Sequence, residues 1–587
     1  VCVLICCIAM GANPKLSWYP LLLAGLPLII RIAWPNAPLR FRVVDFLIFG
    51  FLVTAFIGLW AAYDSGPAYQ KFYLLVGAVL LYYSLSHQPT QNLWQIAIIL
   101  GVFGIIPTGI YLLNASWAAS PADFGIINQL GQRWMEIRPT LNFHSGFGTE
   151  LFHANVVGGI NAILLPISMV ASIHYWHSGK KYLAGFSAFL FLLLGFGLFI
   201  SSSRAGWVAT AIGFLVFGLL NSQKLNGFLR KNEFILILVP AIIIILGIFA
   251  PHPLANIFTN STIPITEVDS FNSRLRIAKQ TYYLIGDFPF TGGGLGSFPG
   301  LYSQYILVIP YFLFSYSHNL YLDLALEQGL AGLALFVSIT LLSANLLKSR
   351  LTQADQPQTL LVTGVYASLI IFLLHGFVGA PLYNTEWGLP LLFVIPGFSI
   401  AMADSRPKVA VSLRNQITII LAGIAFAAVL LIAFLKPLRA IWYADIGAVQ
   451  MAKLELADWP TGQWNEISNP LPYREVEESF RKALSNQADN RTANQRLGVI
   501  LMAEQNFQDA ASYLERSHFS APGHRGIKKS LGYCYTWLGR FDEAKPLLVQ
   551  IPEAQAEMDT YSWWWQTQGR DDLAGNAAIM SKLLSRP

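Results

Sequence analysis

The stretch LAGFSAFLFLLLGFGLFI, residues 183–200, decides the fold class because it holds no charged residue. An α-helix needs about 20 such residues to cross the hydrocarbon core of a bilayer. The residues that follow, Ser201–Trp207, read SSSRAGW and place one cation, Arg204, close behind the apolar run. The pattern therefore predicts a membrane-spanning helix that ends in a polar segment at the membrane surface.

Comparable apolar runs lie on both sides of this stretch and predict an all-α, polytopic membrane protein with about 12–13 spans. Charged residues make up 12% of the chain, about half of the ~25% that soluble domains contain. The chain starts at Val1, and we interpret its first residues as the end of a span and not as a signal peptide. The candidate spans are residues 1–11, 17–34, 44–61, 70–87, 93–113, 154–175, 183–200, 206–221, 234–250, 325–347, 359–377, 388–403 and 417–435.

Charged residues are unevenly distributed along the chain. From Lys436 to the end, 35 of 152 residues are charged, whereas the first 435 residues hold only 35. The contrast predicts a transmembrane domain over residues 1–435 and a soluble helical domain over residues 436–587.

The lysines and arginines between the spans predict how the chain is oriented, because loops on the cytoplasmic side are enriched in both. Loops after even-numbered spans hold thirteen of these residues, and the short loops on the other side hold only Lys15, Lys71 and Arg204. Two long loops, about 114–152 and 251–317, are then extracytoplasmic, and so is the tail after the thirteenth span. The thirteen cytoplasmic residues are Arg31, Arg40, Arg42, Lys180, Lys181, Lys224, Arg230, Lys231, Lys348, Arg350, Arg406, Lys408 and Arg414.

Metal, disulfide and nucleic-acid sites are not indicated by the sequence. The four cysteines form no CxxC pair, which speaks against a zinc site or a disulfide framework. No basic stripe of the kind that binds nucleic acid is present, and the outer loops lack an acidic pair. We therefore expect no metal ion, no cofactor and no nucleic-acid partner.

The tail contains a repeat with a period of 34 residues. Leu497-Gly498 recurs as Leu531-Gly532, and the pairs Phe507 and Phe541, Ala510 and Ala544, and Leu514 and Leu548 keep the same spacing. This pattern resembles the tetratricopeptide repeat, a helix–turn–helix unit that buries its apolar faces by stacking. A partial unit at Tyr473, Val476 and Phe480 and a degenerate one around Trp565, Gly569 and Ala577 would complete a small superhelix, with Trp563–Trp565 in its core.

Three polar motifs follow the span at 183–200 in the order SSSRAGW (201–207), NSRLR (272–276) and SHNLYLDLALEQGLAG (317–332). Together they resemble the O-antigen ligase and O-antigen polymerase superfamily over roughly residues 150–335; Asn155 is a further match. The resemblance implies a GT-C-type glycosyltransferase in a bacterial cytoplasmic membrane. It would transfer a glycan from a polyprenyl diphosphate carrier to an acceptor hydroxyl, with inversion and without a metal ion. The acceptor is a glycan, a lipid or a protein, membrane lipids surround the enzyme, and the repeat domain is available to a protein partner.

The resemblance and elementary chemistry assign roles to these residues. Arginine binds phosphate through a planar fork that stays charged, so Arg204 and Arg274 are predicted to hold the diphosphate, and Arg276 less directly. Loss of one such contact should cost about 3 kcal/mol of transition-state stabilisation. An imidazole can accept a hydroxyl proton at neutral pH, so His318 activates or orients the acceptor. Asn319 and Glu327 are predicted to support the substrate site.

Other interpretations of the same features stay open. An O-antigen-type polymerase and a protein O-oligosaccharyltransferase share this core, and a non-enzymatic scaffold would act through its repeat domain alone. Arg204 by itself could be a snorkelling side chain, and Asp323 and Glu327 could form a structural pair. Gly292–Gly296 lacks the lysine and the preceding strand of a phosphate-binding loop, so a tight turn is favoured.

Overall fold

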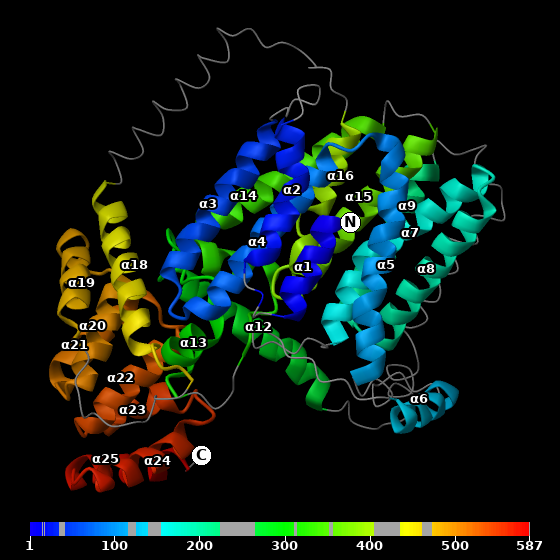
Figure 1. Cartoon of the computed structure of the whole chain (residues 1–587). Helices are drawn as coiled ribbons and strands as arrows, with labels where there is room; N and C mark the ends of the chain where they lie inside the picture. Colours follow the sequence, from blue (N-terminus) through cyan, green and yellow to red (C-terminus); the bar gives the residue numbers. More distant parts are fainter. Residues whose placement is uncertain are drawn as a thin grey trace.

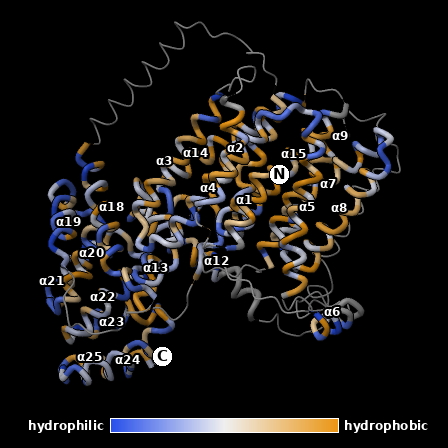
Figure 2. Tube along the Cα trace, viewed as in Figure 1, coloured by the Kyte–Doolittle hydropathy of each residue, from blue (hydrophilic) through white to orange (hydrophobic). Residues whose placement is uncertain are grey.

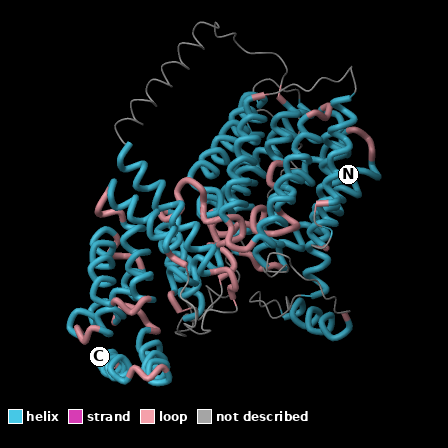
Figure 3. The backbone as a smooth tube through the Cα atoms, turned by 60° about the vertical axis from the view of Figure 1, so that its left-hand side comes forward, coloured by secondary structure: helices cyan, strands magenta, loops and turns pink. Residues whose placement is uncertain are grey.

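The computed structural model describes residues 1–13, 16, 18–33, 42–114, 125–138, 154–222, 265–309, 314–351, 356–403, 435–460 and 472–585. Within these residues every regular element is a helix, and none is a β-strand (Figure 3). The all-α prediction is therefore confirmed over the described part of the chain.

Seven of the described helices are long and apolar enough to cross a membrane. They coincide with seven of the predicted spans and form the strongly apolar bundle of Figure 2. Figure 1 shows them side by side, with the repeat helices beside one end of the bundle. The seven helices are α3 (Val43–Ala61), α5 (Thr90–Asn114), α7 (Ala154–His177), α8 (Lys181–Ile200), α9 (Arg204–Ser222), α14 (Leu320–Leu351) and α15 (Gln356–Gly376).

The other predicted spans divide into three groups. The predicted span 70–87 is a helix, but it carries the buried Lys71 and is less apolar than the seven. The spans predicted at 1–11, 17–34 and 388–403 are shorter apolar helices, and 234–250 and 417–435 lie outside the described residues. The total of thirteen spans therefore stays a prediction. The helices concerned are α1 (Cys2–Ala12), α2 (Tyr19–Ala33), α4 (Ser65–Ser86), the 3₁₀-helix η4 (Leu389–Leu391) and α16 (Val394–Met402).

The outer surface of the bundle is apolar. On α3, the side chains of Phe46, Phe49 and Phe56 are 68%, 65% and 61% exposed. Contiguous exposed rings of this kind are rare on soluble proteins and are typical of a surface that faces lipid. By contrast, α7 lies at the centre of the bundle, where most of its side chains are buried. The arrangement is that of a membrane protein.

A break in α14 allows the loop after α12 to enter the bundle. At Gly329 the backbone has φ 70°, so α14 is two helical segments joined at a kink. The freed carbonyl of Leu326 accepts from the Gly293 N–H at 2.6 Å, and the Leu330 N–H donates to Pro289 O at 2.9 Å. Backbone groups at membrane depth must find such partners because lipid offers none. The elements that flank this loop are α12 (Ile265–Ile285), α13 (Phe298–Tyr302) and the π-helix η3 (Ser303–Leu307), whereas α6 (Gly125–Ile137) lies beside the end of α5.

The glycines of this loop make close packing possible. Gly292 and Gly294 have φ values of +72° and +105°, which favour glycine. A Cβ at Gly292 would lie 2.5 Å from the Glu327 backbone, and one at Gly294 would lie 2.3 Å from the Cα of Ala62. The loop packs directly on α14 and on the end of α3, as expected for a tight turn and not for a phosphate cradle.

The tail folds as antiparallel helix pairs. Gly498 packs against Leu514, and Gly532 packs against Leu548. A Cβ on either glycine would lie 2.6 Å from its leucine. The same glycine–leucine contact therefore recurs after 34 residues. In the last pair Trp565 is buried as predicted, but Trp563 is 64% exposed and does not belong to the core. The helices are α18 (Leu435–Glu455), α19 (Arg474–Asn486), α20 (Arg491–Ala503), α21 (Phe507–Ser520), α22 (Arg525–Trp537), α23 (Phe541–Leu548), α24 (Ala554–Thr567) and α25 (Asp571–Leu584).

A buried ion cluster docks the repeat helices on the segment after α12. The carboxylate of Asp287 accepts from Arg491 at 2.6 Å and from Arg496 at 2.8 Å. Burial alone would raise the pKa of Asp287, but the two guanidinium groups outweigh it and hold the pKa below its usual value. The Arg496 guanidinium also lies 3.2 Å from the centre of the Tyr305 ring. The repeat domain is thus joined to the same loop system that enters the bundle.

His524 makes this docking sensitive to acid. Burial, reinforced by the charge of Arg491, lowers the pKa of His524 to about 3, so the folded ring is neutral. The unfolded chain protonates this ring below about pH 6.5. His524 therefore does not reduce the free energy of unfolding well above pH 6.5. As the pH falls from there toward the folded pKa, the free energy of unfolding decreases, by about 2 kcal/mol at about pH 5.

We expect His524→Asn to weaken this pH dependence. The Nδ1 of His524 accepts from the Ile527 N–H at 3.2 Å as an N-cap, which an asparagine oxygen can replace. Melting temperatures of the full chain at about pH 7.5 and about pH 5 test this. The drop on acidification should be smaller in the variant, and an equal drop in both proteins would contradict the assignment.

Candidate functional site

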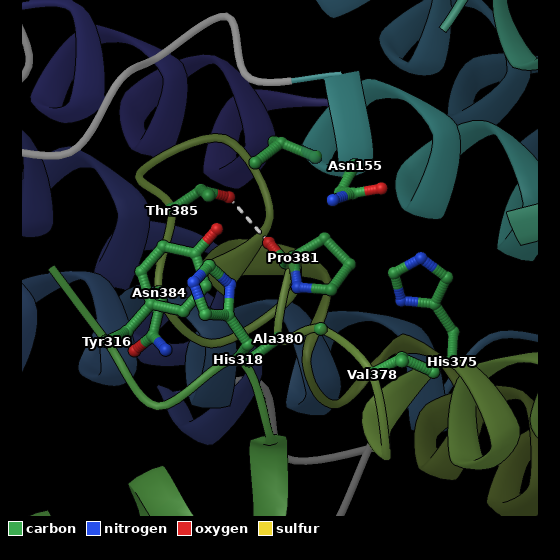
Figure 4. Close-up of a pocket in the computed structure, with 11 residues that line it drawn as sticks. Asn155, Tyr316, His318, His375, Val378, Ala380, Pro381, Asn384 and Thr385 are labelled. Atoms are coloured by element: carbon green, nitrogen blue, oxygen red, sulfur yellow. Dashed lines mark hydrogen bonds between the residues drawn. The ribbon is translucent and has the colours of Figure 1, made fainter. Parts of the chain in front are cut away.

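The candidate site is a small cleft at one end of the membrane bundle, where α7 and α14 begin and α15 ends. The empty space between its lining residues is about 270 Å³, which includes the solvent at its open mouth. Loops and turns gather at this end of the bundle in Figure 3, and the lining side chains are drawn in Figure 4. The cleft is lined by Asn155, Val156, Tyr316, His318, His375, Val378, Gly379, Ala380, Pro381, Asn384 and Thr385.

His318 enters the cleft from a strained turn just before α14. Its φ is 60°, in the left-handed region that a residue with a side chain rarely adopts. Hydrogen bonds of its neighbour hold the turn: the Ser317 N–H donates to the Asp323 carboxylate at 2.9 Å, and the Ser317 hydroxyl donates to Asn319 O at 3.0 Å. Strain of this kind persists where the surroundings fix it, and functional sites are common among such places.

Asn319 begins α14. Its side-chain oxygen accepts from the N–H groups of Tyr321 and Leu322 at 3.0 and 3.1 Å, and its amide donates to Phe377 O at 3.2 Å. The side chain therefore caps α14 and connects it to the end of α15. It stands next to His318 but does not line the cleft.

A buried polar network lies behind His318. Lys71 pairs with Glu327 at 2.8 Å and donates to the side-chain oxygen of Asn384 at 2.9 Å. The amide of Asn384 donates in turn to Asp323 at 2.5 Å. Lys71, Asp323 and Glu327 are each at most 3% exposed. Asn384 also lines the cleft, so the network runs from Glu327, which is not a lining residue, to the turn that carries His318.

Arg274 and Arg276 lie on different sides of α12. Two residues apart, their side chains point to nearly opposite faces of a helix. Arg274 is half-buried and close enough to His375 for its charge to act on that ring. Arg276 is exposed and its charge acts on Tyr302 of α13, where burial raises the tyrosine pKa to about 12 and the cations of Arg525 and Arg276 oppose the rise. Of the two, Arg274 is the one associated with the cleft.

Arg204 is exposed at the first residue of α9. The preceding Ser203 donates its hydroxyl to the side-chain oxygen of Asn155 at 2.9 Å and accepts from the Gly206 N–H at 3.3 Å. Asn155 lines the cleft, so one hydrogen bond joins the start of α9 to the cleft wall. Arg204 itself is not a lining residue.

The three predicted catalytic residues therefore lie at the same end of the bundle, but only one of them lines the cleft. His318 lines the cleft, Arg274 acts on a lining residue, and Arg204 follows a residue bonded to the lining. Sequence reasoning missed His375 and Asn384, and it counted Lys71 as a loop residue although it lies inside α4. An ionisable residue inside an apolar span is a signal for function, and His375 and Lys71 both carried it.

Comparisons with known proteins match two segments of the chain. Residues 189–337 match the family described as O-antigen ligase, and this segment includes Arg204, Arg274 and His318. Residues 501–562 match the tetratricopeptide repeat. Comparison with curated proteins and with solved structures gave no match. This multi-helix membrane protein thus contains a segment, residues 189–337, that is similar to the O-antigen ligase family, and a tetratricopeptide repeat at residues 501–562.

Proposed function

We propose that this protein transfers a glycan from a polyprenyl diphosphate carrier to an acceptor hydroxyl at the extracytoplasmic face of the membrane. The observation that carries the proposal is the cleft itself, where a histidine on a strained turn and the charge of Arg274 come together at one end of the apolar bundle. A carrier of this kind places its lipid in the bilayer and its phosphates at such an end. The side of the membrane rests on the excess of lysine and arginine in the opposite loops.

In the proposed reaction the acceptor oxygen attacks the anomeric carbon of the glycan. The new carbon–oxygen bond forms as the bond from that carbon to the diphosphate oxygen breaks, and the diphosphate leaves with the electron pair. His318 accepts the hydroxyl proton, or orients the hydroxyl if the proton passes to water. Attack opposite the leaving group inverts the anomeric carbon.

Fixed positive charge is the main contribution expected from the arginines. Negative charge develops on the diphosphate as it leaves, and preorganised donors that face it lower the barrier. Arg274 is proposed to bind the diphosphate directly. Arg204, at the exposed start of α9, is proposed to bind it from the rim of the cleft. Arg276, on the opposite face of α12, is given a weaker role.

We expect Arg274→Ala to lower kcat/KM for transfer by about 100-fold, from the ~3 kcal/mol that a lost transition-state donor costs. Arg276→Ala is the matched control, because it removes the same group from the same helix on the other face. It should change the rate by less than about threefold, because its exposed charge acts on the diphosphate only from a distance. Initial rates with purified variants measure both. Equal rates for Arg274→Ala and wild type would exclude Arg274 from diphosphate binding.

The acceptor distinguishes three activities that share this chemistry. Purified protein incubated with a lipid-linked glycan and, in separate reactions, a glycolipid, a second lipid-linked glycan or a protein would identify ligase, polymerase or protein transferase activity. The repeat domain favours a protein as acceptor or as a recruiting partner, because tetratricopeptide repeats present extended binding surfaces. No transfer to any acceptor would leave the scaffold interpretation.

A further inference from the structure

His375 is a second histidine of the cleft, and the proposed reaction does not yet use it. It lies in the last turn of α15, is 1% exposed, and lines the cleft together with His318 and Asn155. Figure 4 shows the two imidazole rings on either side of Pro381. The cleft is therefore bordered by two imidazoles, one from the turn before α14 and one from the last turn of α15.

The ring of His375 has no hydrogen-bond partner within the described part of the chain. Neither Nδ1 nor Nε2 is bonded to another protein group there. In every protonation state at least one of these nitrogens carries a hydrogen and acts as a donor. A buried donor without an acceptor is unfavourable, so a polar group that enters the cleft gains a ready partner.

The surroundings hold the ring in this position. The imidazole of His375 packs against two glycines, Gly159 of α7 and Gly379 after α15. A Cβ at Gly159 would lie 2.9 Å from the imidazole Cε1, and a Cβ at Gly379 would lie 3.0 Å from the same atom. A ring packed this closely cannot turn away to find a partner elsewhere. It is a fixed donor at the cleft wall.

The charge near the ring favours an anionic partner. Arg274 acts on His375 through its positive charge, and the amide side chains of Asn155 and Asn384 add further polar groups to the lining. A phosphate oxygen accepts hydrogen bonds from both an imidazole and a guanidinium, and such bonds to a charged acceptor are among the strong ones.

We propose that His375 binds a phosphate oxygen of the carrier's diphosphate by donating a ring N–H, on the side of the cleft that Arg274 serves. His318 is then left to the acceptor hydroxyl, so the two histidines bind different substrates. This assignment rests on the proposed function, because it takes the diphosphate of the lipid carrier as the ligand.

The test measures binding and not transfer. Purified full-length protein in detergent is titrated with polyprenyl diphosphate that carries no glycan, and Kd is compared across variants. His375→Leu should raise Kd about tenfold or more, since it removes a hydrogen bond to a charged group. His375→Gln keeps a donor and should stay within about threefold, as should His177→Leu, an exposed histidine at the other end of α7.

Three outcomes would overturn the assignment. A folded His375→Leu that binds polyprenyl diphosphate as wild type does would exclude His375 while leaving the proposed function intact. Failure of wild type to bind the diphosphate would remove the proposed function as well. A loss of affinity in His375→Leu for vesicles of an anionic phospholipid, without a loss for polyprenyl diphosphate, would assign the ring to an ordinary lipid headgroup. If His375→Leu does not fold, His375→Asn replaces it, because its shorter amide withdraws the donor from the cleft, and the same rise in Kd is expected.

Discussion

Replacement of His318 is expected to lower kcat for glycan transfer by about 10³-fold, within the range that general acid–base groups contribute. The physical reason is position: the ring projects into the cleft from a turn fixed by Ser317 and Asp323. No other imidazole on this turn could take its place, since Ser317 and Asn319 flank it. The acceptor hydroxyl would then have to lose its proton to water.

The choice of variant separates chemistry from folding. His318 has φ 60°, a conformation that asparagine tolerates better than alanine. His318→Asn should therefore keep the turn and remove the proton acceptor. His318→Ala also removes the acceptor, but alanine disfavours φ 60° and should destabilise the turn. Rates of both variants and their melting temperatures provide the measurement. A His318→Asn protein that transfers glycan at the wild-type rate would show that the ring is not needed for the chemistry.

The second large effect is expected at Lys71. Lys71→Met should destabilise the protein by about 3–5 kcal/mol, because it leaves the Glu327 carboxylate buried without a counter-charge. Both side chains are only 3–4% exposed, and the ammonium also lies 4.0 Å from the centre of the Tyr383 ring. The substitution removes the donor to Asn384 as well, so the network behind His318 loses one of its bonds.

A double variant tests whether the loss comes from the unpaired charge. Lys71→Met combined with Glu327→Met removes both charges and should recover most of the stability, because apolar replacement of a buried pair is often neutral. Lys482→Met is the matched control, since Lys482 makes an exposed pair with Glu478 one helical turn away, and its melting temperature should match wild type. Denaturation of the purified proteins measures all three. A single variant at Lys71 as stable as wild type would contradict the predicted role of the pair.

The repeat domain packs against the rest of this chain, in addition to any binding of a protein partner. The π-helix η3 covers part of the α22 surface. Lys529 of α22 donates to the carbonyl of Leu307, and a Cβ at Gly526 would lie 2.0 Å from Tyr305 O. The same segment follows the glycine-rich loop that packs on α14. The repeats therefore stabilise the loop system that leads to His318, and a partner would use their remaining faces.

Much of the fold could be predicted from the sequence because its signals are local. A helix that crosses a membrane must be long and apolar wherever it lies, and seven predicted spans reappear as such helices. The 34-residue period fixes equivalent contacts within each repeat, so the contacts of Gly498 and Gly532 follow from spacing alone. The motifs with Arg204, Arg274 and His318 were also readable as short runs of residues.

The tertiary structure alone decided which distant residues meet. The pairing of Lys71 with Glu327 joins residues 256 positions apart, and the docking of Arg491 on Asp287 joins residues 204 positions apart. No periodicity encodes such contacts, because they depend on how whole helices pack. For the same reason, a histidine within an apolar span marked His375 as a candidate, but no pattern placed it in the cleft beside His318. Chain-local patterns determined the helices and the repeat, and the packing of those helices determined the site.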